Sequence, residues 1–299
     1  MDSEILEKYM KAGRIAAEAR ELGISMVKDG ALAYDVAEAI EDYIREKGAK
    51  PAFPANLSIN HEAAHYTPTY GDKRRFRTGD LVKVDVGANV DGYIGDTSRT
   101  IEVGSNRYFR LIKASEEGLN TAMDVIRAGV ELDEIGAAVE SVISSFGYRP
   151  IENLTGHLLE KYRLHAGLSI PSVKGLENGI IKEGMAIAVE PFATDGAGYI
   201  KNGGNPGIYM VLDENVKPKK GEQRDFFEAI AENFGNLPFA ERWCHEIDKN
   251  APKLLKQLSR RGYVHGYEVL IDAKKGMVSQ RENTLIVKKD GVIVTTEVD

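Results

Sequence analysis

The sequence has little of what several protein classes require. Cys244 is the single cysteine among 299 residues, which excludes an intrachain disulfide and any disulfide-stabilised scaffold. No run approaches the ~18 consecutive apolar residues of a membrane span. The first residues are charged and lack the apolar core of a signal peptide. We therefore expect a cytoplasmic protein that does not engage a membrane.

Basic side chains are also fewer than acidic ones. They number 39 against 46 acidic ones, and the net charge of −7 gives no overall electrostatic reason to bind nucleic acid. Hydrophobic residues at 42% and charged residues at 28% lie in the usual globular range, which makes extended disorder unexpected. The chain has only six histidines, so candidates for metal or catalytic sites are few.

Glycine, by contrast, is plentiful, and two glycine-bounded segments repeat. Segments 30–51 and 129–150 each begin with glycine, continue as an apolar-periodic helix, and end in glycine followed three residues later by proline. A long helical pattern precedes each segment, at 4–28 and 107–127. The constant offset of 99 residues predicts two halves related by a pseudo-twofold axis. Chance similarity between two amphipathic helices is the alternative.

Short β-rich runs follow the helices in each half. They lie at 81–86, 93–102, 185–190, 284–288 and 292–296. The pattern predicts an α+β fold with antiparallel hairpins and helices outside them. Residues 203–262 have no counterpart in the first half and contain three helical patterns, at 222–234, 239–248 and 252–261. We interpret 203–262 as an inserted helical subdomain within one domain, 1–299.

One predicted hairpin carries two carboxylates. Asp91 and Gly92 form a strong signal for a two-residue turn, and this turn places Gly87 opposite Asp96. Asp85 and Asp96 then lie on one face as diagonal neighbours, roughly 7–8 Å apart at the backbone. Such a pair suits two divalent metals, although an exposed face with both groups hydrated is the alternative. Gly87 predicts space beside Asp96 for a bound group.

Other candidate ligands are histidines and carboxylates at strand ends. His65, His157 and His165 lie in glycine-flanked or β-like contexts, although an isolated histidine is more often a structural residue than a ligand. The repeat offset carries His65 to within one residue of His165, which predicts one histidine from each half across the axis. Glu190 and Glu282 border strand-like runs, where a carboxylate can equally be a solubilising edge.

Six motifs occur in a fixed order along the chain. They are Ala64-His65-Tyr66-Thr67-Pro68, the Asp85/Asp96 hairpin, Gly156-His157, His165-Ala166-Gly167, Glu190-Pro191-Phe192 and Gln280-Arg281-Glu282-Asn283. This order, from about residue 5 to the C-terminus, resembles the methionine aminopeptidases of the pita-bread fold. The helical segment before the last motif resembles their type 2 class, in a short, archaeal-style form without a charged N-terminal extension. The resemblance implies a curved antiparallel sheet inside and helices outside.

The resemblance also implies a ligand set for two divalent cations, of Co, Mn, Fe or Zn. Asp85 would hold one metal, His157 and Glu190 the other, and both metals would contact Asp96 and Glu282. A metal-activated hydroxide would attack the scissile carbonyl, and Glu190 would accept the water proton.

The implied reaction removes the initiator methionine from the N-termini of nascent proteins. His65 and His165 would bind substrate and stabilise the tetrahedral intermediate or the leaving amine; the sequence leaves open which histidine does which. Matching by distance from the motifs places Phe53, Leu164 and Tyr267 in the methionine pocket, where Ile208 replaces a histidine frequent in the type 2 class. We expect a monomer with transient proximity to the ribosome.

Two alternatives share this fold. A proline dipeptidase or proline-specific aminopeptidase has the same ligands, but usually carries a large N-terminal domain, whereas here the first repeat starts close to Met1. A non-catalytic pita-bread module that binds ribosomes typically lacks some of the ligands, whereas all five are present here.

Overall fold

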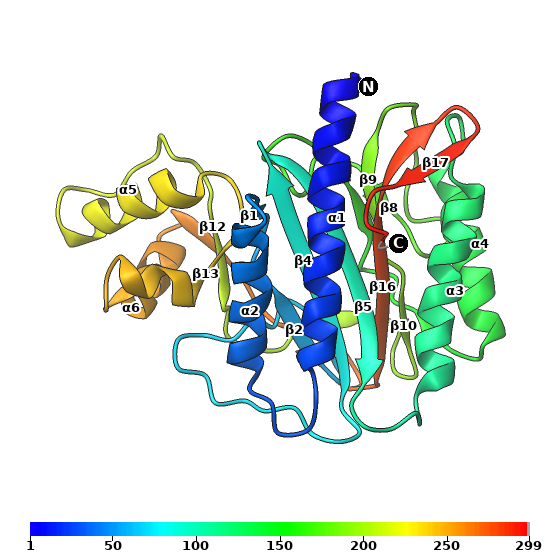
Figure 1. Ribbon diagram of the computed structural model, residues 1–299, viewed down its shortest axis with the longest axis horizontal. Coiled ribbons are helices and arrows are strands. Elements are labelled where there is room, and N and C mark those ends of the chain that lie inside the picture. The colour runs from blue at the N-terminus through cyan, green and yellow to red at the C-terminus, as the bar shows by residue number, and fades with distance from the viewer. Residues whose placement is uncertain (298–299) are drawn as a thin grey trace.

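The computed structural model describes residues 1–297, so the last two residues of the predicted domain 1–299 lie outside the described residues. Helices cover one side of a large sheet, and a smaller group of elements lies at one end (Figure 1). The helices are α1 (Ser3–Met26), α2 (Ala33–Glu46), α3 (Phe109–Val125), α4 (Leu132–Ser145), α5 (Glu222–Phe234), α6 (Ala251–Arg260) and the 3-10 helix η1 (Glu241–Glu246).

The large sheet is antiparallel, with the strand order β1-β4-β5-β16-β9-β7-β8. Its strands are β1 (Lys50–Pro51), β2 (Asn56–Ile59), β4 (Leu81–Val90), β5 (Tyr93–Glu102), β6 (Arg149–Pro150), β7 (Gly156–Leu159), β8 (Ser169–Ile170), β9 (Ala186–Val189), β10 (Phe192–Thr194), β16 (Val278–Lys288) and β17 (Gly291–Val294). A second sheet joins β11 (Ile200–Asn202), β15 (Leu270–Asp272) and β3 (Glu62–Ala64). A third joins β13 (Phe239–Ala240), β12 (Ile208–Val211) and β14 (Val264–Tyr267).

The predicted repeat appears as two helix pairs on the same side of the sheet (Figure 1). The first pair, α1 and α2, shares an apolar core with β4, and the second, α3 and α4, shares another with β9 and β16. Gly48 and Gly147 have φ values of 76° and 83°, so each takes the left-handed conformation that ends a helix. The helix pattern of both halves is therefore confirmed, as is the α+β class.

Several predicted strands differ in length from the observed ones. The predicted run 81–86 continues to Val90, and the run 284–288 begins six residues earlier, at Val278. The extra length of β16 pairs with β5 and β10, which are remote in sequence, so no local pattern could have indicated it. The predicted strand 185–190 ends at Val189, which leaves Glu190 just beyond β9.

The segment 203–262 contains helices, as predicted, but also strands. The predicted helix 239–248 is instead the short strand β13 followed by η1. Helices α5 and α6 pack with β12 around an apolar core of their own, which includes Phe227 and Leu255. That core extends to Val264 in β14, beyond the predicted end at 262. The boundaries of an inserted subdomain remain a prediction.

The helices were compared with the requirements of a membrane span. Among residues 1–297, none of them combines the length and the apolar character that crossing a bilayer requires.

Candidate metal centre and substrate pocket

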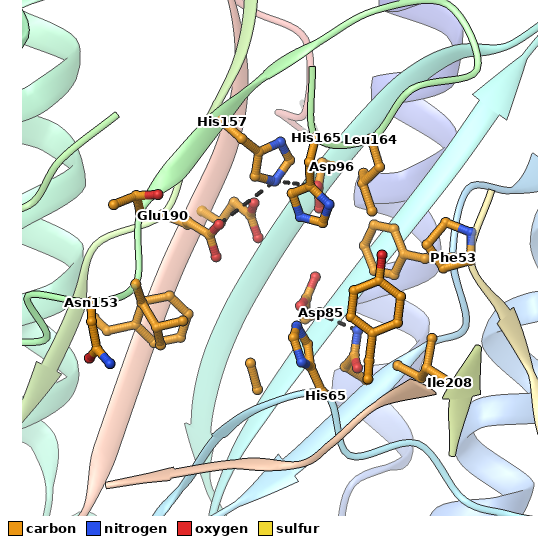
Figure 2. Close-up of a pocket in the computed structure, with 18 residues that line it drawn as sticks. Phe53, His65, Asp85, Asp96, Asn153, His157, Leu164, His165, Glu190 and Ile208 are labelled. Carbon is orange, nitrogen blue, oxygen red and sulfur yellow. Dashed lines mark hydrogen bonds and ion pairs between the residues drawn. The ribbon is translucent and has the colours of Figure 1, made fainter. Parts of the chain in front are cut away.

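Five neighbouring strands of the large sheet each bring one predicted ligand to the same pocket. Asp85 lies on β4, Asp96 on β5, Glu282 on β16 and His157 on β7, while Glu190 directly follows β9. These strands are adjacent in the order β4-β5-β16-β9-β7, so ligands far apart in the sequence converge (Figure 2). All five side chains line one cavity on the face opposite α1–α4.

The register predicted for the acidic hairpin is confirmed. Gly87 pairs with Asp96, and the turn residues Asp91 and Gly92 have φ values of 53° and 88°. Two consecutive left-handed residues are what a tight two-residue hairpin needs. The turn therefore fixes which side chains of β4 and β5 face the pocket.

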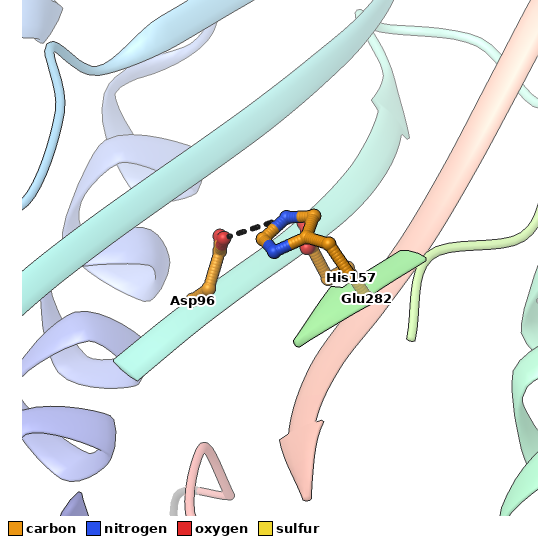
Figure 3. Close-up of side chains that lie close together, drawn as sticks. All are labelled: Asp96, His157 and Glu282. Atoms are coloured by element: carbon orange, nitrogen blue, oxygen red, sulfur yellow. Dashed lines mark ion pairs between the residues drawn. The ribbon is translucent and has the colours of Figure 1, made fainter. Parts of the chain in front are cut away.

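Asp96, His157 and Glu282 form the tightest group (Figure 3). Each offers a ligand atom, and these atoms lie within 4.8 Å of one another. The His157 Nε2 atom is 3.6 Å from Asp96 Oδ2 and 3.7 Å from Glu190 Oε1. Asp85 lines the same pocket but lies outside this group of three.

The metal-free centre is electrostatically unfavourable. Burial raises the pKa of Asp85 to about 7. The pKa values of Asp96, Glu190 and Glu282 are raised well above their ordinary range, mainly by burial and further by repulsion between the carboxylates. Burial and the neighbouring His165 lower the pKa of His157 to about 3, so this imidazole is neutral and supplies no positive charge. A cation from outside the chain would offset the negative charge that burial disfavours here.

Unpaired buried atoms point to the same conclusion. Within residues 1–297, Asp85 Oδ1 and Asp96 Oδ1 are buried without a hydrogen-bond partner. Buried acceptors without partners are rare and costly in folded proteins. Carboxylate oxygens beside a neutral imidazole are a donor set for a divalent transition metal. The residues present therefore fit a metal.

Sequence reasoning assigned no role to two amides that contact the ligands. Gln280 Nε2 donates to Glu190 Oε2 at 3.2 Å and to Glu282 Oε2 at 3.3 Å, while Asn56 Nδ2 reaches Asp85 Oδ2 at 3.5 Å. Gln280 lies two residues before Glu282 on one strand, and this period-2 spacing could have indicated a shared face. Asn56 had no such signal, because β2 meets β4 only through a non-local pairing.

Two further predicted histidines line the pocket. His65 Nδ1 lies 3.3 Å from the Glu268 carbonyl oxygen, and burial lowers the pKa of His65 to about 4. A carbonyl can only accept, so Nδ1 carries the hydrogen and the neutral ring keeps Nε2 as an acceptor. His65 has a φ of 68°, in the left-handed region that non-glycine residues rarely adopt. The His165 ring packs edge-on against His157, with centroids 4.4 Å apart.

The same cavity, of about 330 Å³, has an apolar wall beside the acidic group. Phe53, Leu164 and Tyr267 line it, as the motif spacing predicts, and Ile208 lines it as the resemblance to the type 2 class implies. The space predicted beside Gly87 is not free for a bound group, however. A Cβ on Gly87 would lie 2.2 Å from the Phe53 ring, so the missing side chain lets that ring lie against the sheet.

Residues 7–288 match the model of metallopeptidase family M24. The chain belongs to this family. The match spans all five predicted ligands and both helix pairs, so the M24 assignment covers the pocket as well as the fold.

Curated relatives match this M24 chain over its full length. A methionine aminopeptidase of Saccharolobus solfataricus is 44% identical over 300 residues, covering 99% of each chain. One from Archaeoglobus fulgidus is 44% identical, covering 99% of this chain and 100% of its own. One from Methanocaldococcus jannaschii is 42% identical with the same coverage. All three organisms are archaea, in line with the predicted archaeal-style form.

Solved structures support the M24 fold. A thermophilic Arx1 superposes with a TM-score of 0.89 at 19% identity, covering 99% of this chain and 91% of its own. A methionine aminopeptidase of Thermotoga maritima has a TM-score of 0.72 at 21% identity, covering 100% and 98%. A prolidase of Pyrococcus furiosus has a TM-score of 0.65 at 20% identity, and the match covers 100% of this chain but 65% of the prolidase. The pita-bread fold predicted from the motifs is confirmed.

Proposed function

We propose that this chain is a metal-dependent methionine aminopeptidase of the type 2 class, which removes the initiator methionine from nascent proteins. The observation that carries the proposal is the convergence of five ligand-type side chains beside an apolar pocket. Full-length similarity to archaeal methionine aminopeptidases supports the same activity. Substrates are protein and peptide N-termini.

The centre would hold two divalent cations, of Co, Mn, Fe or Zn. Asp85 would hold one and His157 and Glu190 the other, while Asp96 and Glu282 would serve both. Four carboxylates match the charge of two divalent ions, which supports this number. When bound, such ions make water a stronger acid and polarise a carbonyl oxygen.

The protein's own groups bind, orient and transfer protons. Glu190, which has one oxygen toward His157 and the other toward Gln280, accepts the proton of the attacking water. His65 presents Nε2 as an acceptor and so orients an N–H of the substrate. His165 takes the remaining task, a hydrogen bond to the developing oxyanion.

The pocket wall selects the first side chain of the substrate. Phe53, Leu164, Ile208 and Tyr267 offer an apolar surface to the thioether chain of methionine. An apolar slot discriminates a missing or extra methylene by only ~1–3 kcal/mol, so a norleucine N-terminus is also accepted.

The cellular setting follows from the substrate. Nascent chains emerge at the ribosome, so the enzyme acts in the cytoplasm in transient proximity to it. We expect a monomer that binds neither nucleic acid nor membrane.

Peptide hydrolysis separates this activity from that of a proline peptidase. The protein, supplied with divalent metal, is incubated with Met-Gly-Ser and with Ala-Pro-Ala, and the released amino acid is quantified. We expect methionine release to exceed hydrolysis of the proline peptide. A preference for Ala-Pro-Ala would assign the proline-specific activity instead.

Metal content separates the enzyme from a non-catalytic module. We expect two metals per chain in the unchanged protein and a loss of metal in Asp96→Ala. Fewer than two metals, with a content that Asp96→Ala leaves unchanged, would favour the binding module.

A further inference from the structure

On the opposite face of the metal-binding strands lies a cluster of three arginines. Arg281 of β16 pairs directly with Arg99 of β5, so their side chains project from the same face of the sheet. Arg20 of α1 is buried beside them and donates to Thr97, next to the pair. Like charges directly opposite on neighbouring strands are destabilising. This pair therefore calls for a negative partner.

The Glu21 carboxylate pairs with two of the three arginines. Glu21 accepts from Arg20 Nε at 3.0 Å and from Arg99 Nη1 at 3.1 Å. Arg281 receives nothing comparable: within residues 1–297 its Nη1 atom is buried without a hydrogen-bond partner. Glu21 and Glu116 lie close enough to attract the Arg281 guanidinium, but neither forms a hydrogen bond with its Nη1 atom. The Arg281 guanidinium is thus left without a hydrogen-bond partner at Nη1.

A cavity of about 510 Å³ lies over this guanidinium, between α1 and α3. Both helices lie on the same side of the sheet, with β5 and β16 between them (Figure 1). Asn283 shares the Arg281 face of β16, and its Oδ1 accepts from Thr296 at 3.0 Å. Its amide nitrogen then has only the Met123 sulfur, at 4.0 Å. Three arginines and Asn283 thus line the cavity together with two carboxylates, those of Glu21 and of the exposed Glu297.

We propose that this cavity binds one small oxyanion of the phosphate class, held by Arg281 with Arg20, Arg99 and Asn283 beside it. A planar guanidinium offers two parallel N–H groups to an oxyanion, which gives a strong, charge-assisted contact. The remaining oxygens of a tetrahedral anion can face the other donors. This site is separate from the metal centre, and the proposal does not rest on the catalytic function.

Phosphate binding to matched variants tests the proposal. The metal-loaded protein, Arg281→Met and Arg110→Met are each titrated calorimetrically with inorganic phosphate at constant ionic strength, and their unfolding temperatures are followed. Arg110 is an exposed arginine of α3 outside the cavity. All three proteins carry the same metal centre, so phosphate bound there contributes equally to each.

We expect phosphate to bind and stabilise the unchanged protein and Arg110→Met. Arg281→Met should bind at least about tenfold more weakly, because a charge-assisted pair is lost. Without phosphate, Arg281→Met should be as stable as the unchanged protein or more so, since the like-charge pair is gone. Arg99→Met serves as a second variant if Arg281→Met does not fold. Equal phosphate binding by the Arg281 and Arg110 variants, or none by the unchanged protein, would overturn the proposal.

Discussion

At the residue scale, the tautomer of His65 separates substrate binding from metal binding. Its Nδ1 is engaged by the Glu268 carbonyl, so only Nε2 can serve the substrate. We expect His65→Ala to retain its metal content while kcat/KM for Met-Gly-Ser falls about 100-fold or more. His61→Ala, which removes a histidine outside the pocket, is the matched control. Loss of metal from His65→Ala would show that His65 is a ligand rather than a substrate-side residue.

Gln280 gives a second prediction at this scale. Its amide donates to Glu190 and Glu282, and Ser98 Oγ donates to its Oε1 at 2.9 Å, which fixes the orientation of the amide. Partners of metal ligands typically contribute 10–100-fold to metal affinity, so Gln280→Leu should weaken metal binding by about that factor. Competition with a chelator measures the change, with Gln257→Leu on α6 as the control. An unchanged affinity would contradict the role assigned to Gln280.

Single residues were predictable where chemistry and spacing coincide. Asp85 and Asp96 could be paired from the sequence because a two-residue turn fixes every cross-strand neighbour. Asn56 could not be found, since its contact with Asp85 depends on the pairing of β2 with β4, and no local pattern encodes that pairing.

At the scale of elements, the Phe53 ring can lie against strand β4 because residue 87 is a glycine. Gly87→Ala should displace the ring and raise KM for methionine peptides about tenfold, with metal content unchanged. Phe53→Leu in the same chain removes the clash and should recover part of the loss, which steady-state kinetics on both variants would test. A normal KM for Gly87→Ala would mean that the ring does not set the pocket.

Elements were predictable to the extent that their signals are local. Helices α1 to α4 follow from periodicity, with glycines that end α2 and α4, and the 93–102 strand matches β5 residue for residue. The prediction failed at 239–248, where β13 pairs with β12 and η1 continues the chain. Its helical pattern is also compatible with a short strand and a 3-10 turn.

At the scale of the whole molecule, the acidic centre ties stability to pH when metal is absent. The pKa of Asp85 is about 7 in the folded protein against 3.8 ordinarily, so the folded state keeps a proton that the unfolded chain loses. The contribution of this group to stability is full below pH 4 and is lost as the pH rises through 7. Asp85→Asn should therefore match the metal-free parent near pH 4 and be the more stable protein at pH 8, because it lacks the carboxyl group that must ionise in a buried site.

The difference is measured by denaturant unfolding of the parent and of Asp85→Asn between pH 4 and pH 8, after a chelator has removed the metal from both proteins. Because the comparison is between variants, the contribution of Lys83, whose pKa burial also shifts, cancels, whereas Asp96, Glu190 and Glu282 are repelled by Asp85 and respond to its removal. A difference that stays constant with pH would contradict a raised pKa at Asp85.

The architecture as a whole was predictable because the repeat supplied long-range information. A 99-residue offset relates the two helix pairs, and the ordered motifs identified the sheet that lies beneath them. The arginine cluster behind the metal centre was not predictable, because Arg20, Arg99 and Arg281 come together only through the pairing of β5 with β16 and the packing of α1.

The central claim is that bound metal enables this pocket to remove N-terminal methionine. The most direct test is to deplete the protein of metal and titrate divalent ions back while following methionine release from Met-Gly-Ser, with the N-acetylated peptide as control. The account predicts no release without metal, release that saturates at two equivalents per chain, and no cleavage of the acetylated peptide. Methionine release at full rate from the metal-depleted protein would contradict it.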